Sequence, residues 1–134
     1  MESNMSNHPI STDKAPAALG PYSQAISANF AFKGTVLFCS GQIGLDPATG
    51  NLREGFEAQV DQAFSNLKAV IEAAGGNFGG VVKLTLFLTD LSNFATVNAK
   101  METLFAKPYP ARSTVGVASL PKGAVFEVEA IVTV

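Results

Sequence analysis

Cysteine, histidine and charge are scarce in this 134-residue chain, and each shortage excludes a class of site. Cys39 is the only cysteine and His8 the only histidine. The chain therefore cannot form an internal disulfide, nor a Cys/His zinc site from its own residues. Charged residues make up 15% of the sequence, the formal net charge is -2, and the lysines and arginines stand singly. Such a chain offers little to the phosphates of a nucleic acid, so we expect no nucleic-acid partner.

Long hydrophobic runs are also missing. No apolar stretch approaches the ~20 residues that a membrane span requires. Residues 1–14 contain neither the apolar core of a signal peptide nor the arginines of a transit peptide. We therefore expect a cytoplasmic protein with no membrane partner.

Hydrophobic residues, in contrast, make up 47% of the chain. This content and the chain length are typical of one globular domain. Residues 1–14 are polar and without period, so we expect a flexible N-terminal arm followed by a single domain over residues 15–134. The mean hydropathy of +0.24 in so small a chain suggests that some apolar surface is buried between subunits.

Apolar periodicity predicts two helices and five strands. Large apolar residues over residues 56–74 fall at the 3-and-4 spacing of one helical face, before a stop at Gly75 and Gly76. A second helix should begin at Ser92 or Asn93, either of which can cap it, and end before the next prolines. Alternation and turn signals predict strands over residues 22–28, 35–43, 81–90, 112–118 and 125–134, with a turn at Phe32 to Gly34.

The resulting order, β-β-α-β-α-β-β, indicates an α+β fold in which one mixed sheet carries both helices on one face. The last strand alternates an apolar stripe suited to that face with Glu127 and Glu129 on the other. In the strand before it, Arg112 and Thr114 share one face, and we expect that face to be turned away from the helices. A second subunit covering this charged face would make a cleft between chains, where carboxylate pKa values rise.

Arg112 and Glu127 are the strongest candidates for chemistry. The planar, permanently charged guanidinium of Arg112 can hold the carboxylate of a small organic acid through two parallel hydrogen bonds. An ion pair with Glu127 or Glu129 that only stabilises the fold is an equally open alternative. Glu127 can act as a general base toward water if it is desolvated. Cys39, inside an apolar strand and without a histidine partner, is more typical of an inert buried thiol than of a nucleophile.

Five segments, in order, carry a family resemblance: APAALGPYSQA, FCSGQIGLDPATG, QAFSNLKAVIEAAG, VVKLTLFLTDLSNFATVNA and PARSTVGVASLPKGAVFEVEAI. Together they resemble the RidA/YjgF family of enamine/imine deaminases, older members of which were labelled endoribonuclease L-PSP. The resemblance runs from about Ala15 to Val132, which is nearly the whole chain. The last segment is diagnostic, because Pro-Ala-Arg-Ser is followed by Leu-Pro-Lys and a strand that contains glutamate.

The resemblance implies a chorismate-mutase-like fold that forms a homotrimer through the sheet face without helices. Each of its three clefts would be shared by two neighbouring chains. Deaminating members hydrolyse reactive 2-imino acids, such as 2-iminopropanoate and 2-iminobutanoate, to 2-oxo acids and ammonia. The family chemistry implies no cofactor and no metal, and the expected partners are small 2-imino and 2-oxo acids.

The resemblance also assigns roles to individual residues. Arg112 would clamp the substrate carboxylate, and Glu127 would deprotonate the water that attacks the imine carbon. Glu129 is then left as a structural carboxylate. Thr114 stands where many active members have cysteine, and Met101 stands at a position that is often aromatic. The pocket would be lined by Tyr22, Ser40, Gly41, Asn98 and the backbone around Thr114.

Two other functions fit the same residues. A non-catalytic trimer would use Arg112 to hold a 2-oxo acid for regulation, with Thr114 marking lost turnover. The older family label carries a second alternative, a ribonuclease that inhibits translation. The acidic balance of the chain and the missing histidine general base argue against ribonuclease activity.

Overall fold

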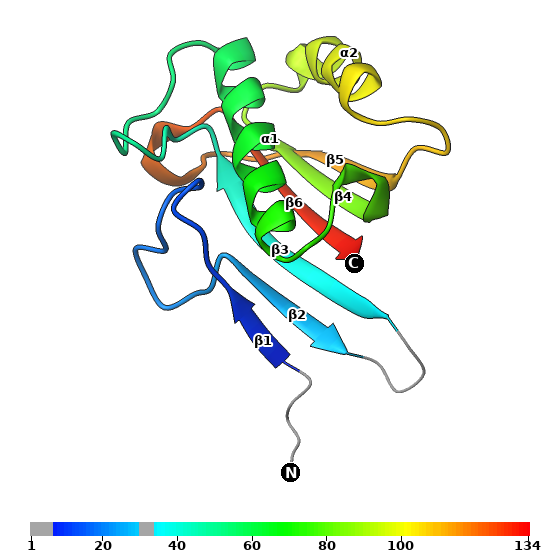
Figure 1. The fold of residues 1–134 in the computed structure, drawn as a ribbon. Helices are drawn as coiled ribbons and strands as arrows, with labels where there is room; N and C mark the ends of the chain where they lie inside the picture. Colours follow the sequence, from blue (N-terminus) through cyan, green and yellow to red (C-terminus); the bar gives the residue numbers. More distant parts are fainter. Residues whose placement is uncertain (1–6, 30–33) are drawn as a thin grey trace.

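A computed structural model describes residues 7–29 and 34–134, and its centre is one six-stranded mixed sheet (Figure 1). Among the described strands only the β4–β5 pair is parallel. Helices α1 (Phe56–Ala73) and α2 (Phe94–Leu104) cover the same face of the sheet. Across the sheet the strands follow the order β1 (Asn7–Ile10), β2 (Ala25–Asn29), β3 (Thr35–Ile43), β6 (Phe126–Thr133), β4 (Val81–Leu88) and β5 (Ala111–Gly116).

The α+β class and the two helices on one face are confirmed, and the sheet has one strand more than predicted. This strand, β1, lies in the segment expected as a flexible arm and pairs antiparallel with β2. The buried side chain of Gln24 anchors the residues after β1, because it hydrogen-bonds both the N–H and the C=O of Thr12. Most of the turn expected at Phe32 to Gly34 lies outside the described residues, as do residues 1–6.

Helix α1 forms where the apolar spacing predicts it, and it packs against β3 and β6. A buried asparagine interrupts its apolar face. Asn66 is fully buried, and its Nδ2 donates hydrogen bonds to the carbonyl oxygens of Ile43 and Leu45 at 3.1 and 2.8 Å. Its Oδ1 accepts a hydrogen bond from Gln62 Nε2 at 2.8 Å. Asn66 therefore ties the C-terminal end of β3 to the helix.

Helix α2 follows a short 3-10 helix, Leu91–Asn93, and begins differently from the prediction. Neither Ser92 nor Asn93 caps it with a side chain. Instead, the Asp90 carboxylate accepts a hydrogen bond from the Ser92 N–H at 3.0 Å, one turn earlier. Neither α1 nor α2, nor any other helix in the described part of the chain, is long and apolar enough to cross a membrane.

Strand β6 alternates as predicted. Its apolar stripe is buried beneath the helices, while Glu127 and Glu129 are half-buried on the opposite face. That opposite face also carries Phe38 of β3, which is 45% exposed. In a single chain, therefore, the sheet face away from the helices presents both charge and an exposed aromatic ring.

The faces of β5 are reversed relative to the prediction. Arg112 lies beside Leu84, and Thr114 beside Leu86, in the parallel β4–β5 ladder. Neighbours in register point to the same face of a sheet, and both leucines are fully buried under the helices. Arg112 and Thr114 therefore lie on the helix face, opposite to the glutamates of β6.

The reversal has a physical reason. Alternation separates the two faces of a strand, but in a strand at the sheet edge it does not tell which face the helices cover. The more apolar face of β5 is exposed in the chain, and its Val115 is 39% exposed. The face with Arg112 instead meets α2, because the guanidinium contacts Met101 and Phe94 of that helix.

Candidate active site

The first half of the site is built around Glu127 and a bulge in β3. The β3–β6 register shifts between Cys39 and Gln42, which gives β3 one extra residue at Ser40 and Gly41. A β-carbon on Gly41 would lie 2.8 Å from Glu127 Cδ and would overlap the carboxylate. Glycine at this position therefore leaves the space in which the Glu127 side chain lies across β3.

The pKa of the Glu127 carboxyl is raised above its ordinary value. Partial burial is the larger cause, because it penalises the charged form, and the nearby charge of Glu129 is the smaller one. Glu129 lies two residues further along β6 on the same face. A carboxylate with a raised proton affinity is better suited to take a proton from water than an ordinary surface glutamate.

Glu127 lines a cavity of about 500 Å³ together with Tyr22, Ser40 and Gly41. The structure thus brings four of the predicted site residues into one place. The Ser40 hydroxyl donates a hydrogen bond to the Ser23 carbonyl at 2.6 Å, which ties β3 to the segment before β2. The Tyr22 side chain is 54% exposed, so it forms a rim of this cavity and not part of the core.

Lys122 of the diagnostic Leu-Pro-Lys segment also lines the Glu127 cavity, although it was not among the predicted site residues. Its backbone is left-handed, with φ 59 and ψ 20, a conformation that costs a non-glycine residue free energy. The short 3-10 helix that contains it, Pro121–Gly123, leads into β6. The Pro-Lys-Gly sequence signals a turn, but no sequence rule identifies its middle residue as the left-handed one.

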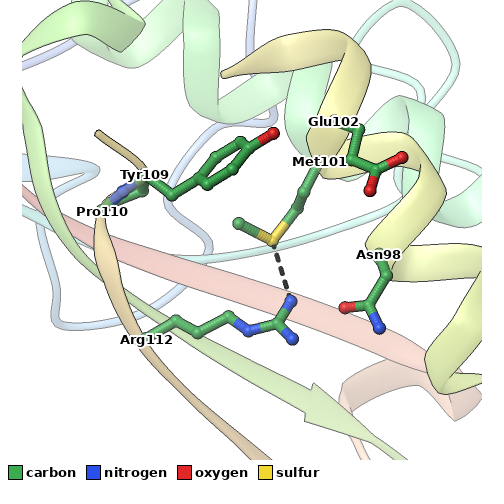
Figure 2. A pocket seen from close by; sticks show the side chains of 6 residues that line it. All are labelled: Asn98, Met101, Glu102, Tyr109, Pro110 and Arg112. Carbon is green, nitrogen blue, oxygen red and sulfur yellow. Dashed lines mark hydrogen bonds between the residues drawn. The ribbon is translucent and has the colours of Figure 1, made fainter. Parts of the chain in front are cut away.

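The second half of the site is built around Arg112. Its guanidinium is held by α2: Nη1 donates a hydrogen bond to the Met101 sulfur at 3.2 Å, and Cζ lies 5.0 Å from the centre of the Phe94 ring. Arg112 lines a second cavity, of about 320 Å³, whose other lining residues are Asn98, Met101, Glu102, Tyr109 and Pro110. In Figure 2 the Asn98 carboxamide and the Arg112 guanidinium lie side by side and face the same space.

No aspartate or glutamate forms an ion pair with Arg112 in residues 7–29 and 34–134. A structural ion pair with Glu127 or Glu129 is therefore wrong for the single chain, since both glutamates lie on the other face. Thr114 follows Arg112 on the same face of β5. Its hydroxyl oxygen is buried and has no hydrogen-bond partner among the described residues.

The predicted site residues therefore divide into two groups. Tyr22, Ser40, Gly41 and Glu127 line one cavity, whereas Asn98 and Arg112 line another, with Thr114 beside them. Arg112 and Glu127 extend from opposite faces of the sheet, on strands separated by β4. Within one chain the two principal candidates cannot contact one small ligand.

Other chemistry is limited in the part of the chain that the structure describes. Its residues contain no group of three or more His, Cys, Asp or Glu side chains that could hold a metal ion. Cys39 is buried, and desolvation raises the pKa of its thiol to about 12. The predicted burial of this thiol is confirmed, and the raised pKa disfavours the thiolate that a nucleophile needs.

The family model described as Endoribonuclease L-PSP matches residues 12–134. The chain belongs to the RidA/YjgF family. It is 47% identical to the 2-iminobutanoate/2-iminopropanoate deaminase of Salmonella typhimurium, over 91% of this chain and 94% of that relative.

Solved structures of the RidA/YjgF family have the same fold. RidA from the Antarctic bacterium Psychrobacter sp. is similar with a TM-score of 0.87 and 50% identity, over 95% of this chain and 99% of that one. E. coli TdcF, solved with bound serine, is similar with a TM-score of 0.82 and 38% identity. That comparison covers 95% of this chain and 98% of the TdcF chain.

Proposed function

We propose that this RidA-family chain hydrolyses small 2-imino acids, such as 2-iminopropanoate and 2-iminobutanoate, to 2-oxo acids and ammonia. The observation that carries the proposal is that Arg112 lies at a cavity without an ion-pair partner in the described residues. Its guanidinium stands half-buried at a cavity, in contact with a sulfur atom and an aromatic ring, and it forms no ion pair with Glu102 of the same cavity or with any other carboxylate of the described residues. Such a cation is ready to take the carboxylate of a ligand. The named activity of the Salmonella relative supplies the substrate class.

In the proposed reaction Arg112 binds the substrate carboxylate and thereby fixes the imine carbon. Ionised Glu127 accepts a proton from a water molecule while the water oxygen bonds to that carbon, and then passes the proton to the imine nitrogen. The same carboxylate takes the hydroxyl proton of the carbinolamine and returns it to the nitrogen as the C–N bond breaks. Ammonia leaves and the 2-oxo acid remains, so Glu127 ends as it began.

The opposite placement of Arg112 and Glu127 supports a cleft shared by two copies of the chain. The Arg112 cavity of one copy would meet the Glu127 cavity of its neighbour, in a homotrimer that covers the exposed sheet face. Asn98 and Thr114 would line the cleft from the first copy, and Tyr22, Ser40 and Gly41 from the second. The buried, unpartnered Thr114 hydroxyl fits this role, because a ligand or bound water would give it a hydrogen-bond partner. We place this trimer in the cytoplasm.

A coupled assay tests the activity. A serine dehydratase would generate 2-iminopropanoate, and the loss of the imine would be followed with wild-type protein and the variants Arg112→Ala and Glu127→Gln. We expect the wild type to accelerate hydrolysis and each variant to lose about 100-fold or more of that acceleration.

Ligand binding separates the two roles in the same variants. Glu127→Gln should still bind 2-oxobutanoate, because its carboxylate clamp is intact, whereas Arg112→Ala should not. A wild type that binds 2-oxobutanoate but leaves the imine half-life at its background value would instead identify a non-catalytic 2-oxo-acid-binding protein, which is the second candidate.

A further inference from the structure

The two contacts that the structure records for the Arg112 guanidinium are both with uncharged groups, although the Glu102 carboxylate lines the same cavity without forming an ion pair with it. Nη1 donates to the Met101 sulfur at 3.2 Å, and the guanidinium carbon lies 5.0 Å from the centre of the Phe94 ring. A thioether sulfur is a weak acceptor, and an aromatic face attracts a cation through its quadrupole. Both contacts orient the guanidinium without neutralising its charge.

Helix α2 supplies both contacts from one side. Phe94 and Met101 are seven residues apart, which is two helical turns, so they lie on the same side of α2 as Val97 and Asn98. Val97 is fully buried and Met101 is 5% exposed, so this part of the helix is anchored in the core, whereas Phe94 at the start of the helix is 40% exposed. The sulfur therefore has a fixed position although methionine is a flexible residue.

Because the sulfur and the aromatic ring are uncharged, these contacts can hold the guanidinium without competing with a substrate carboxylate. A carboxylate in place of Met101 or Phe94 would hold the guanidinium more strongly, but it would compete with a substrate carboxylate for the same N–H groups. Neutral contacts leave most of the five donors unused and the full positive charge available. Figure 2 shows the guanidinium extending past Met101 toward the cavity.

We propose that Met101 and Phe94 are positioning residues that hold the Arg112 guanidinium in the orientation that receives the substrate carboxylate. This role rests on the proposed function of Arg112 and extends it to two residues that act through the guanidinium, of which Met101 also lines the Arg112 cavity. It also gives a purpose to the thioether at position 101, where the sulfur takes one N–H of the guanidinium and leaves the others facing the cavity.

Two conservative variants test the inference. Met101→Leu keeps an apolar side chain of similar size and removes the sulfur acceptor, and Phe94→Leu removes the aromatic face. For each we expect the dissociation constant of 2-oxobutanoate and the KM for 2-iminopropanoate to rise about 3- to 10-fold, with kcat changed less than about twofold. The Nε–H signal of Arg112 in ¹⁵N NMR spectra should broaden or shift, because the guanidinium samples more orientations.

Phe78→Leu is the matched control, because Phe78 is another half-buried ring packed on the core that contacts Phe105 and not Arg112. It should leave the KM, the 2-oxobutanoate affinity and the Arg112 signal unchanged. Melting curves of all variants separate loss of positioning from loss of folding.

The outcomes distinguish this inference from the proposed function. If Arg112→Ala abolishes 2-oxobutanoate binding while Met101→Leu and Phe94→Leu bind as tightly as the wild type, the positioning role is wrong and the clamp stands. If Arg112→Ala retains wild-type affinity, the clamp is wrong and the positioning role falls with it. A rise in KM in the two leucine variants that the Phe78 control does not share supports the inference.

Discussion

At the scale of single residues, two neighbours set the environment of Glu127: Gly41, which leaves space for its carboxylate, and Glu129, which adds negative charge nearby. Gly41 has no β-carbon where the carboxylate lies. Glu129, on the same face, adds negative charge that raises the pKa of Glu127 beyond the effect of burial. Each neighbour can be changed by one atom or one charge, so each contribution can be measured separately.

The Glu129→Gln variant should shift the pH profile of catalysis. As a base, Glu127 must be ionised, so kcat/KM falls when the pH drops through its raised pKa. Glutamine at position 129 removes the smaller cause of that rise, and the acidic limb should move to lower pH. A limb that stays in place or moves to higher pH would show that Glu129 does not act on Glu127.

The Gly41→Ala variant should displace the Glu127 carboxylate, because the new methyl group needs the same space. The end of a half-buried glutamate can move, so we expect the fold to survive and kcat to fall about 10- to 100-fold. Melting temperature and imine hydrolysis would be measured on the same preparation. Wild-type kcat in a folded Gly41→Ala protein would mean that the position of Glu127 over β3 does not matter for turnover.

The sequence predicts which residues belong to the candidate site, but it does not predict which groups their side chains contact. The resemblance to the RidA/YjgF family identified Arg112, Glu127 and Gly41 as site residues. It did not identify the contacts of Arg112 with Met101 and Phe94, since they depend on the distance between α2 and β5. Helical spacing alone puts Phe94 and Met101 on one side of α2, but it does not indicate that this side contacts a cation.

At the scale of secondary-structure elements, Asn66 joins α1 to the end of β3, close to the bulge that shapes the Glu127 cavity. Both carbonyl groups that it satisfies, those of Ile43 and Leu45, belong to residues lining that cavity. Burial of these groups without a partner would be costly, so the amide is required where apolar spacing alone would place a hydrophobic residue.

The Asn66→Leu variant should lower the free energy of unfolding by about 2–4 kcal/mol, because two buried carbonyl groups lose their donor. Gln62→Ala is the control: it removes one hydrogen bond to the same asparagine from a half-buried position, and it should cost less than about 1 kcal/mol. Urea unfolding at equal protein concentrations compares them. Equal stability of the two variants would mean that the Asn66 hydrogen bonds to β3 contribute little.

The elements themselves were predictable where they carry a long periodic pattern. Helix α1 and strand β6 have such patterns, and both form as expected. Strand β1 is four residues long, polar and contains Pro9, so it has no pattern of its own; pairing with β2 makes it a strand. The face of β5 depended on where α2 lies, which is a tertiary property that alternation within one strand does not contain.

At the scale of the whole molecule, the division of the candidate site between two faces makes a sharp prediction about mixtures. Arg112→Ala chains keep Glu127, and Glu127→Gln chains keep Arg112. If the cleft is shared, an Arg112 from one variant can meet a Glu127 from the other. Equal amounts of both, assembled together at random, should regain about a quarter of the wild-type activity, because about one cleft in four receives both functional residues.

The two variants assayed separately, and mixed without subunit exchange, provide the baselines for this experiment. Light scattering or native mass spectrometry on the same samples reports the oligomeric state, which we expect to be trimeric. No recovery after verified co-assembly would place both residues' contributions within one chain, against the geometry proposed here.

A chain with two different half-clefts on opposite faces associates head to tail, because the Arg112 side of one copy meets the Glu127 side of the next. An open row of copies leaves one unpaired half-cleft at each end, whereas a closed ring leaves none. Under the proposed arrangement, a closed ring has one complete cleft for each chain, and an open assembly has fewer. Dilution that opens the ring should then lower activity while every chain is still folded, so that turnover itself reports assembly.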